Sequence, residues 1–133
     1  MPKTRTKKRK LDYSKIQRPT RKVGGKTYTF RSRWEYNVAK WLQMRLENGE
    51  IEKWEFEPKA FCLKRSNGQT VGYLPDFRVI GLGETYYIEV KGRMTDEDEE
   101  KIELFREQFG RLDLIDETEY QILRWRFGRK LKF

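Results

Sequence analysis

The order of apolar and polar positions along the chain predicts short strands framed by helices. Residues 31–48 are predicted to form a helix, because they are good helix formers without Pro or Gly and because Gly49 follows them. Apolar and β-branched segments then predict strands at 51–57, 61–65, 71–80 and 86–91. The Asn67-Gly68 step favours a tight hairpin turn, and Pro75 favours an edge position or a bulge.

The C-terminal third of the chain carries two helix-capping signals. Thr95 and Asp98 resemble a capping box at the start of an acidic helix. A short buried strand at 112–115 precedes a final helix at about 117–126, which Asp116 caps. The resulting order αββββαβα predicts an α/β fold, in which helices flank a mixed central sheet of four to five strands.

The composition narrows the chemistry that the protein can use. A chain of 133 residues fits one domain, and its 4 Trp, 7 Tyr and 8 Phe supply large side chains for a core. The absence of histidine excludes His-based acid–base catalysis and His-ligated metals, and one cysteine excludes a disulfide framework or a Cys-rich zinc site. Catalysis by this chain would therefore use carboxylates, lysine, hydroxyl groups or a metal held by oxygen.

The hydropathy of the chain bears on its compartment. No apolar run reaches the length of a membrane span, and the basic N-terminus is not followed by the apolar region of a signal peptide. We therefore expect an intracellular protein, cytoplasmic or nucleoid-associated, with no membrane partner.

Positive charge is concentrated at the N-terminus. The formal net charge is +9, and residues 1–26 contain eleven Lys or Arg and one Asp, so residues 27–133 are close to neutral. Because they hold few large apolar residues, residues 1–26 are predicted to be a flexible basic arm, followed by a single domain at 27–133. The arm predicts contact with nucleic-acid phosphates, although a solubilising or nuclear-localisation tail has the same composition. Its candidate DNA-binding residues are Lys7, Lys8, Arg9, Lys10, Arg21 and Lys22.

The C-terminal end of the domain is also basic. Residues 120–133 contain five Lys or Arg and no acid, and aromatic residues such as Trp125 and Phe127 lie between them. Basic side chains beside aromatic ones suit phosphates and exposed bases. The alternative is that Trp125 and Phe127 belong to the core.

Glu35 lies at the centre of the apolar stripe of the predicted first helix. Successive helical residues are about 100° apart, so Leu42 and Leu46 fall about 20° on either side of Glu35. An unpaired buried carboxylate is costly, and we therefore expect a cation beside it. That cation is either a metal ion or an arginine at the edge of the stripe, such as Arg31.

A second group of charged residues lies on two predicted strands. Glu89 and Lys91 share one face of the strand at 86–91, because side chains alternate along a strand, and Asp76 follows the bend expected at Pro75. If these strands are neighbours, Asp76 and Glu89 converge on one divalent cation, Mg²⁺ or Mn²⁺, which accepts oxygen ligands. Lys91 would then lie beside the attacking water, whose pKa the metal lowers.

These residues resemble the motif of a known enzyme superfamily. Pro75-Asp76, twelve residues and then Glu89-Val90-Lys91 resemble the PD-(D/E)XK nuclease motif, and the resemblance covers about residues 30–128. Within the superfamily the chain is most similar to Holliday junction resolvases of the archaeal type and the phage endonuclease I type, and transposon-end nucleases have a similar core. The resemblance implies a restriction-endonuclease-like αβββαβ core, a divalent metal and often a homodimer.

The resemblance also implies roles for individual residues. By position, Asp76, Glu89 and the carbonyl of Val90 would be metal ligands. Lys91 would orient or activate water, and Glu35 would complete the acidic cluster as a further catalytic and metal-binding residue.

Four further residues are candidate DNA contacts. Arg31, Ser32 and Arg33 begin the helix that carries Glu35, where free backbone N–H groups favour anions, and Arg93 follows the strand of Glu89. Helix capping by Ser32 and a solvated loop position for Arg93 are the alternatives.

The leading hypothesis is a Mg²⁺- or Mn²⁺-dependent endodeoxyribonuclease that hydrolyses phosphodiester bonds of branched DNA, such as Holliday junctions, as a homodimer. A second hypothesis is a nicking or restriction-like nuclease that acts on duplex DNA. A third is a basic nucleic-acid-binding module without catalysis, whose carboxylates are structural.

Overall fold

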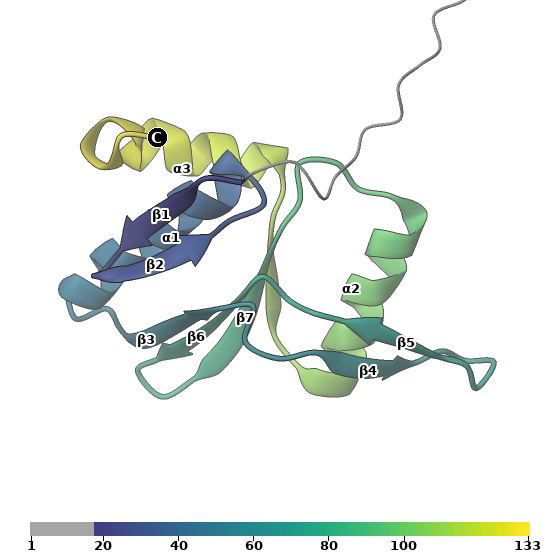
Figure 1. The fold of residues 1–133 in the computed structure, drawn as a ribbon. Coiled ribbons are helices and arrows are strands. Elements are labelled where there is room, and N and C mark those ends of the chain that lie inside the picture. The colour runs from purple at the N-terminus through teal and green to yellow at the C-terminus, as the bar shows by residue number, and fades with distance from the viewer. Residues whose placement is uncertain (1–17) are drawn as a thin grey trace, which may run out of the picture.

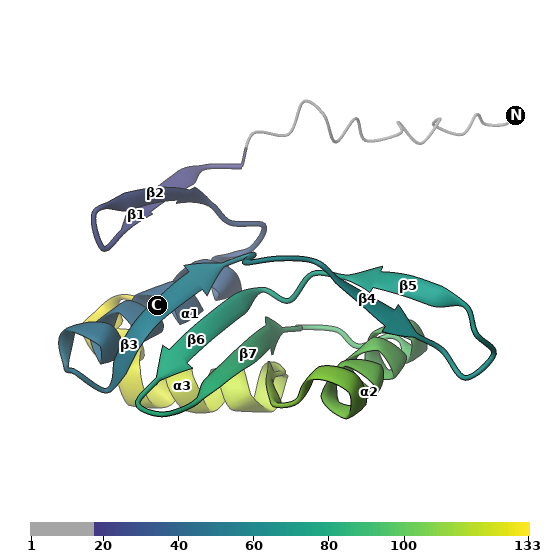
Figure 2. The same cartoon turned by 90° about the horizontal axis from the view of Figure 1, so that it is seen from below.

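A four-stranded sheet forms the centre of the fold in the computed structural model, which describes residues 18–133. The strand order is β3-β6-β7-β8, with bounds Ile51–Phe56, Phe77–Gly81, Thr85–Val90 and Leu112–Ile115. Figures 1 and 2 label β3, β6 and β7 of this sheet. Strands β3, β6 and β7 are antiparallel, whereas β7 and β8 are parallel. A parallel pair needs a crossover, and α2 (Asp96–Phe109) provides it.

Two groups of elements lie on either side of this sheet. Helices α1 (Arg33–Glu47) and α3 (Glu117–Leu131) share one hydrophobic core with β3, β6 and β7. Strands β4 (Phe61–Lys64) and β5 (Thr70–Tyr73) form a hairpin that packs with α2 in a second core. Figure 1 shows α1 and α3 at one side of the molecule, and α2 with the β4–β5 hairpin at the other.

The predicted fold class is confirmed at this level: the protein is mixed α/β, with a four-stranded mixed sheet flanked by helices. The capping box of Thr95 and Asp98 is present, and Asp116 caps α3. Helix α3 continues to Leu131, five residues beyond its predicted end, so the basic C-terminal segment is largely helical.

The predicted strand at 71–80 is two strands in two different sheets. Residues Thr70–Tyr73 pair with β4, and Phe77–Gly81 enter the central sheet. Pro75 between them is fully buried and has no N–H group, so a continuous ladder cannot pass through it. The chain therefore changes sheets immediately before Asp76.

The predicted arm at 1–26 is too long, because its last part is folded. Strand β1 (Thr20–Val23) pairs with β2 (Lys26–Thr29) in an antiparallel hairpin. Gly24 and Gly25 form the two-residue turn with φ of 61° and 83°, values that glycine adopts without strain. Val23 is buried in the first core and anchors the hairpin on α1, whereas residues 1–17 of the arm lie outside the described residues.

Among residues 18–133, none of the three helices has the length and hydropathy that a membrane-spanning segment needs.

Candidate active site

Asp76 and Glu89 lie opposite each other where β6 and β7 end. Phe77 pairs with Ile88, so the next step of the antiparallel register brings Asp76 beside Glu89. Both are buried, at 2% and 4% exposure. The N–H group of Val90 donates a hydrogen bond of 2.7 Å to Oδ2 of Asp76 and fixes that carboxylate.

The two carboxylates disfavour each other's charge. Burial, followed by repulsion from Glu89, raises the pKa of Asp76 to about 8. Burial also raises the pKa of Glu89 above its ordinary value. A cation at this position would favour both charged forms.

Glu89 has two further partners. The hydroxyl of Tyr73 donates a hydrogen bond of 2.7 Å to Oε1 of Glu89, and Nζ of Lys91 is 3.6 Å from Oε2. The same Nζ is 3.4 Å from Oδ1 of Asp98, the capping-box carboxylate of α2. Tyr73 and Asp98 thus hold Glu89 and Lys91, and neither was predicted as a site residue from the sequence.

Arg31 lies among three carboxylates. Its guanidinium is 3.0 Å from Oδ1 of Asp76, 3.3 Å from Oε2 of Glu57 and 3.6 Å from Oε2 of Glu35. Glu35 is buried, as its place on the helix stripe predicts, and also accepts a 2.8 Å hydrogen bond from the N–H group of Arg31. The arginine alternative for the partner of Glu35 is therefore present in the structure.

Glu57 was not predicted as a site residue: it was placed at the end of the strand at 51–57, whereas β3 ends at Phe56. Its backbone has a left-handed φ of 47°, and its N–H group donates a 2.7 Å hydrogen bond to the carbonyl of Asp76. We call Glu35, Glu57, Asp76 and Glu89 the acidic cluster. Within residues 18–133, no three acidic side chains lie close enough together to form a ready-made metal site.

A small cavity of about 210 Å³ opens beside this cluster. Glu89, Lys91 and Arg31 line it together with residues of β5 and the first turns of α2. Of the predicted catalytic residues, Glu89 and Lys91 therefore face an accessible space, whereas Asp76 and Glu35 do not line it.

The predicted DNA-binding residues occupy several places. Lys7, Lys8, Arg9 and Lys10 lie outside the described residues. Ser32 caps α1 by accepting a 3.1 Å hydrogen bond from the N–H group of Glu35, which is the capping alternative. Lys22, Arg33 and Arg93 are exposed, and Arg21 is half-buried.

Two of these residues, Arg21 and Arg33, lie over the ring of Tyr36. Lys40, which was not predicted to contact DNA, lies over the same ring. We call Arg21, Arg33, Lys40 and Tyr36 the Tyr36 cluster. Positions 33, 36 and 40 follow helical spacing, and that signal could have identified them; the contribution of Arg21 depends on the fold of the hairpin.

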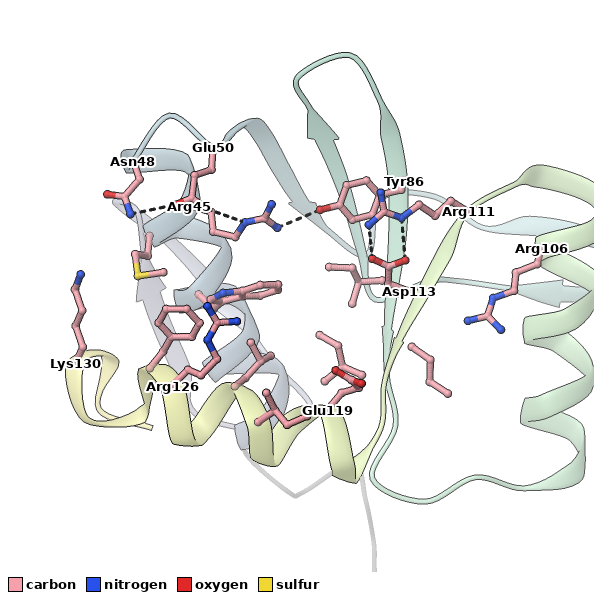
Figure 3. A pocket seen from close by; sticks show the side chains of 18 residues that line it. Arg45, Asn48, Glu50, Tyr86, Arg106, Arg111, Asp113, Glu119, Arg126 and Lys130 are labelled. Atoms are coloured by element: carbon pink, nitrogen blue, oxygen red, sulfur yellow. Dashed lines mark hydrogen bonds and ion pairs between the residues drawn. The ribbon is translucent and has the colours of Figure 1, made fainter.

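A larger groove of about 830 Å³ lies between α1, β7, β8 and α3 (Figure 3). Its arginines are mostly paired within the protein: Arg45 contacts Glu50 and the hydroxyl of Tyr86, and Arg111 contacts Asp113. None of the predicted catalytic residues lines this groove.

The aromatic residues of the C-terminal segment divide into two kinds. Trp125 is 86% exposed on α3 and is not a core residue. Phe127 and Phe133 are half-buried and pack against the first core, so the core alternative holds for Phe127.

Comparison with known proteins gives a family assignment. The family model described as "Protein of unknown function (DUF1064)" matches residues 14–122, most of the chain, and the chain belongs to this family. No curated protein and no solved structure matches the chain.

Proposed function

We propose that this member of the DUF1064 family is a metal-dependent endodeoxyribonuclease that hydrolyses phosphodiester bonds. The observation that carries the proposal is the pair of buried carboxylates, Asp76 and Glu89, beside Lys91 at the edge of a cavity. Burying two adjacent acids is unfavourable for folding. Such a pair is typical of a site where chemistry requires it.

The donor set fits a hard divalent cation. Asp76 and Glu89 offer carboxylate oxygens, and their raised pKa values reflect negative charge that burial leaves poorly stabilised. Mg²⁺ usually binds through one or two carboxylates and retains several waters, so it does not require a third acid in place. Asp76, Glu89 and the carbonyl of Val90 are the proposed ligands, with Glu35 as a further member of the acidic group.

A bound Mg²⁺ or Mn²⁺ would neutralise charge on the phosphate and acidify a water molecule. The chain's own residues supply the remainder. Lys91 is held between Glu89 and Asp98 and presents its ammonium group to the cavity, where it orients a water or a phosphate oxygen. Tyr73 fixes the carboxylate of Glu89 by its hydrogen bond.

Arg31 has a place in the same proposal. Its side chain is 49% exposed, so it can reach toward a substrate phosphate and leave the carboxylates to a metal. This movement would reconcile its predicted role as a DNA contact with its present ion pairs.

The order α1, β3, β6, β7, α2, β8 supports assignment to the restriction-endonuclease-like core, since it reproduces αβββαβ around the sheet.

The proposal also specifies a substrate and an oligomeric state. We propose branched DNA such as a four-way junction, cut by a homodimer whose two sites are related by a two-fold axis.

One observation favours a second candidate function, a nucleic-acid-binding module without catalysis. Arg31 already pairs with Glu35, Glu57 and Asp76, so these acids have a structural partner. In that case Asp76 and Glu89 would have no role in DNA cleavage.

Cleavage of a synthetic four-way junction distinguishes the nuclease from the binding module without catalysis. The unsubstituted protein is expected to cut the junction with Mg²⁺ and not with EDTA. Asp76→Asn, Glu89→Gln and Lys91→Ala should each reduce the rate by about 10³-fold or more, because the metal and the positioned water are lost. Binding of the junction in EDTA should persist in all three.

Two controls make this experiment specific. Glu103→Gln removes an exposed carboxylate of α2 and should leave cleavage unchanged. Cleavage that survives substitution of Asp76, Glu89 and Lys91 would refute the site. Equal cutting of linear duplex would keep the nuclease and remove the preference for junctions.

A further inference from the structure

Three cations converge on one aromatic ring at the start of α1. The ring centroid of Tyr36 is 4.3 Å from Nζ of Lys40, 5.4 Å from the guanidinium carbon of Arg21 and 5.8 Å from that of Arg33. Two of the cations come from α1 and the third from β1, so the folding of the hairpin onto the helix assembles the group.

No acid compensates this charge within the described part of the chain. Among residues 18–133, no carboxylate lies within ion-pair distance of Arg21, Arg33 or Lys40. Nζ of Lys40 donates instead to the carbonyls of Leu131 and Lys132, at 2.7 and 2.9 Å. This contrasts with Arg31, only two residues before Arg33, which contacts three carboxylates.

Lys40 and Tyr36, at the centre of the cluster, are held in place before any ligand binds. The two carbonyls fix Lys40, and the ring of Tyr36 packs on the buried Phe30 with centroids 5.8 Å apart. Partial burial, together with the positive charges of Arg33 and Arg21, lowers the pKa of Lys40. An anion among the three cations would relieve this repulsion.

We propose that Arg21, Arg33 and Lys40 form a binding site for a backbone phosphate of a nucleic acid. The identification of the polymer as nucleic acid rests on the proposed function, since the same helix carries both sites. Lys40 follows Glu35 by five residues, about 7.5 Å along the helix axis. The same five residues turn about 140° around the helix, so Lys40 faces a different side of α1 from Glu35, and the phosphate site would contact the backbone away from the proposed cleavage site.

The test is DNA binding in EDTA, which separates binding from cleavage. The affinity of a fluorescent four-way junction and a linear duplex would be measured between 50 and 200 mM salt. The double variant Arg33→Gln/Lys40→Gln should bind about tenfold more weakly at 0.1 M salt, and the slope of log K against log salt should fall by about 2. Arg21→Gln alone should lower the slope by about 1.

Lys53→Gln is the matched control, since Lys53 is an exposed lysine of β3 with one weak ion pair to Glu55 at 3.6 Å. It should change neither affinity nor slope. Among residues 18–133, the side chain of Arg33 makes no hydrogen bond that would be lost, so Arg33→Gln should fold normally. Far-UV circular dichroism checks the folding of each variant.

The two proposals can fail separately. If the double variant binds with the affinity and slope of the unsubstituted protein, the phosphate site is wrong even when Mg²⁺-dependent cleavage is observed. If the double variant loses affinity while the unsubstituted protein cuts no DNA, the phosphate site stands and the nuclease fails. A loss of equal size in Lys53→Gln would also overturn the site, because the effect would then be general to surface charge.

Discussion

The acidic cluster and the Tyr36 cluster both include residues of α1, where Glu35 and Tyr36 are adjacent, yet their charges are compensated differently. The carboxylates around Asp76 and Glu89 have partners within the protein: Arg31, the hydroxyl of Tyr73, Lys91 and a backbone N–H group. The cations around Tyr36 have an aromatic ring and carbonyl oxygens but, within residues 18–133, no carboxylate.

Because of this difference, the acidic cluster has a cation within the protein, whereas the Tyr36 cluster is open to an anion from outside. Glu35, Asp76 and Glu89 of the acidic cluster are buried, and the guanidinium of Arg31 compensates charge there without a metal. The Tyr36 cluster is more exposed, where water screens repulsion and where an anion can enter directly. Removing one cation should therefore have opposite effects on stability in the two places.

Substitution of Arg31 is expected to give the largest loss of stability at one pH. Arg31→Ala leaves Asp76 and Glu35 buried without their cation, and should lower the free energy of unfolding by about 3 kcal/mol at pH 8 without divalent metal. This loss is at the low end for a broken buried ion pair, because about half of the arginine side chain is exposed to water, which screens the interaction. Urea denaturation measures it, with Lys53→Ala as the control. A loss no greater than that of the control would show that Arg31 does not compensate the cluster.

The second effect is expected in the pH dependence of the free energy of unfolding, with and without the carboxyl group of Asp76. The pKa of Asp76 is about 8 in the folded protein, above its ordinary value of 3.8, so the folded state holds this proton more tightly than the unfolded state. Stability contributed by this group is complete below about pH 4 and is lost as the pH rises through 8.

In EDTA, the free energy of unfolding should therefore fall between pH 5 and pH 9 in the unsubstituted protein. In Asp76→Asn the decline should be smaller by up to about 4 kcal/mol, which is three pH units at about 1.4 kcal/mol each, because the titrating carboxyl is gone. Thermal or urea unfolding at several pH values checks this, with Glu103→Gln as the control. Parallel curves for Asp76→Asn and the unsubstituted protein would contradict the raised pKa.

The smallest effect is expected at Arg33. Arg33→Gln removes one of three like charges around Tyr36, so it should leave stability unchanged or raise it by up to about 0.5 kcal/mol at low salt. The gain should disappear at high salt, where repulsion is screened. A destabilisation comparable with that of Arg31→Ala would mean that the two clusters do not differ as described.

The sequence predicted most of the fold because its signals are local. Capping residues, helix formers and the alternation of apolar residues located α1, β3, β7, α2, β8 and α3. The division of the segment 71–80 was not predicted, since the sheet that each half joins depends on long-range pairing. The hairpin at 20–29 was missed because its polar composition suggested an arm, although Gly24-Gly25 was a turn signal.

The candidate site was predictable in part. The strand register brings Asp76 to Glu89, and the helix stripe buries Glu35, as the spacing indicated. Glu57 and Tyr73 could not be found, because a loop with positive φ and a second hairpin bring them to the site. Whether Arg31 or a metal accompanies Glu35 is likewise a question of three-dimensional neighbours that spacing does not answer.

The most direct test of the acidic cluster is a calorimetric titration of Mn²⁺ into the purified protein. We expect one ion per chain in the unsubstituted protein and in Glu103→Gln, and no binding in Asp76→Asn or Glu89→Gln. Absence of binding in the unsubstituted protein, or unchanged binding after substitution of Asp76 and Glu89, would contradict this expectation.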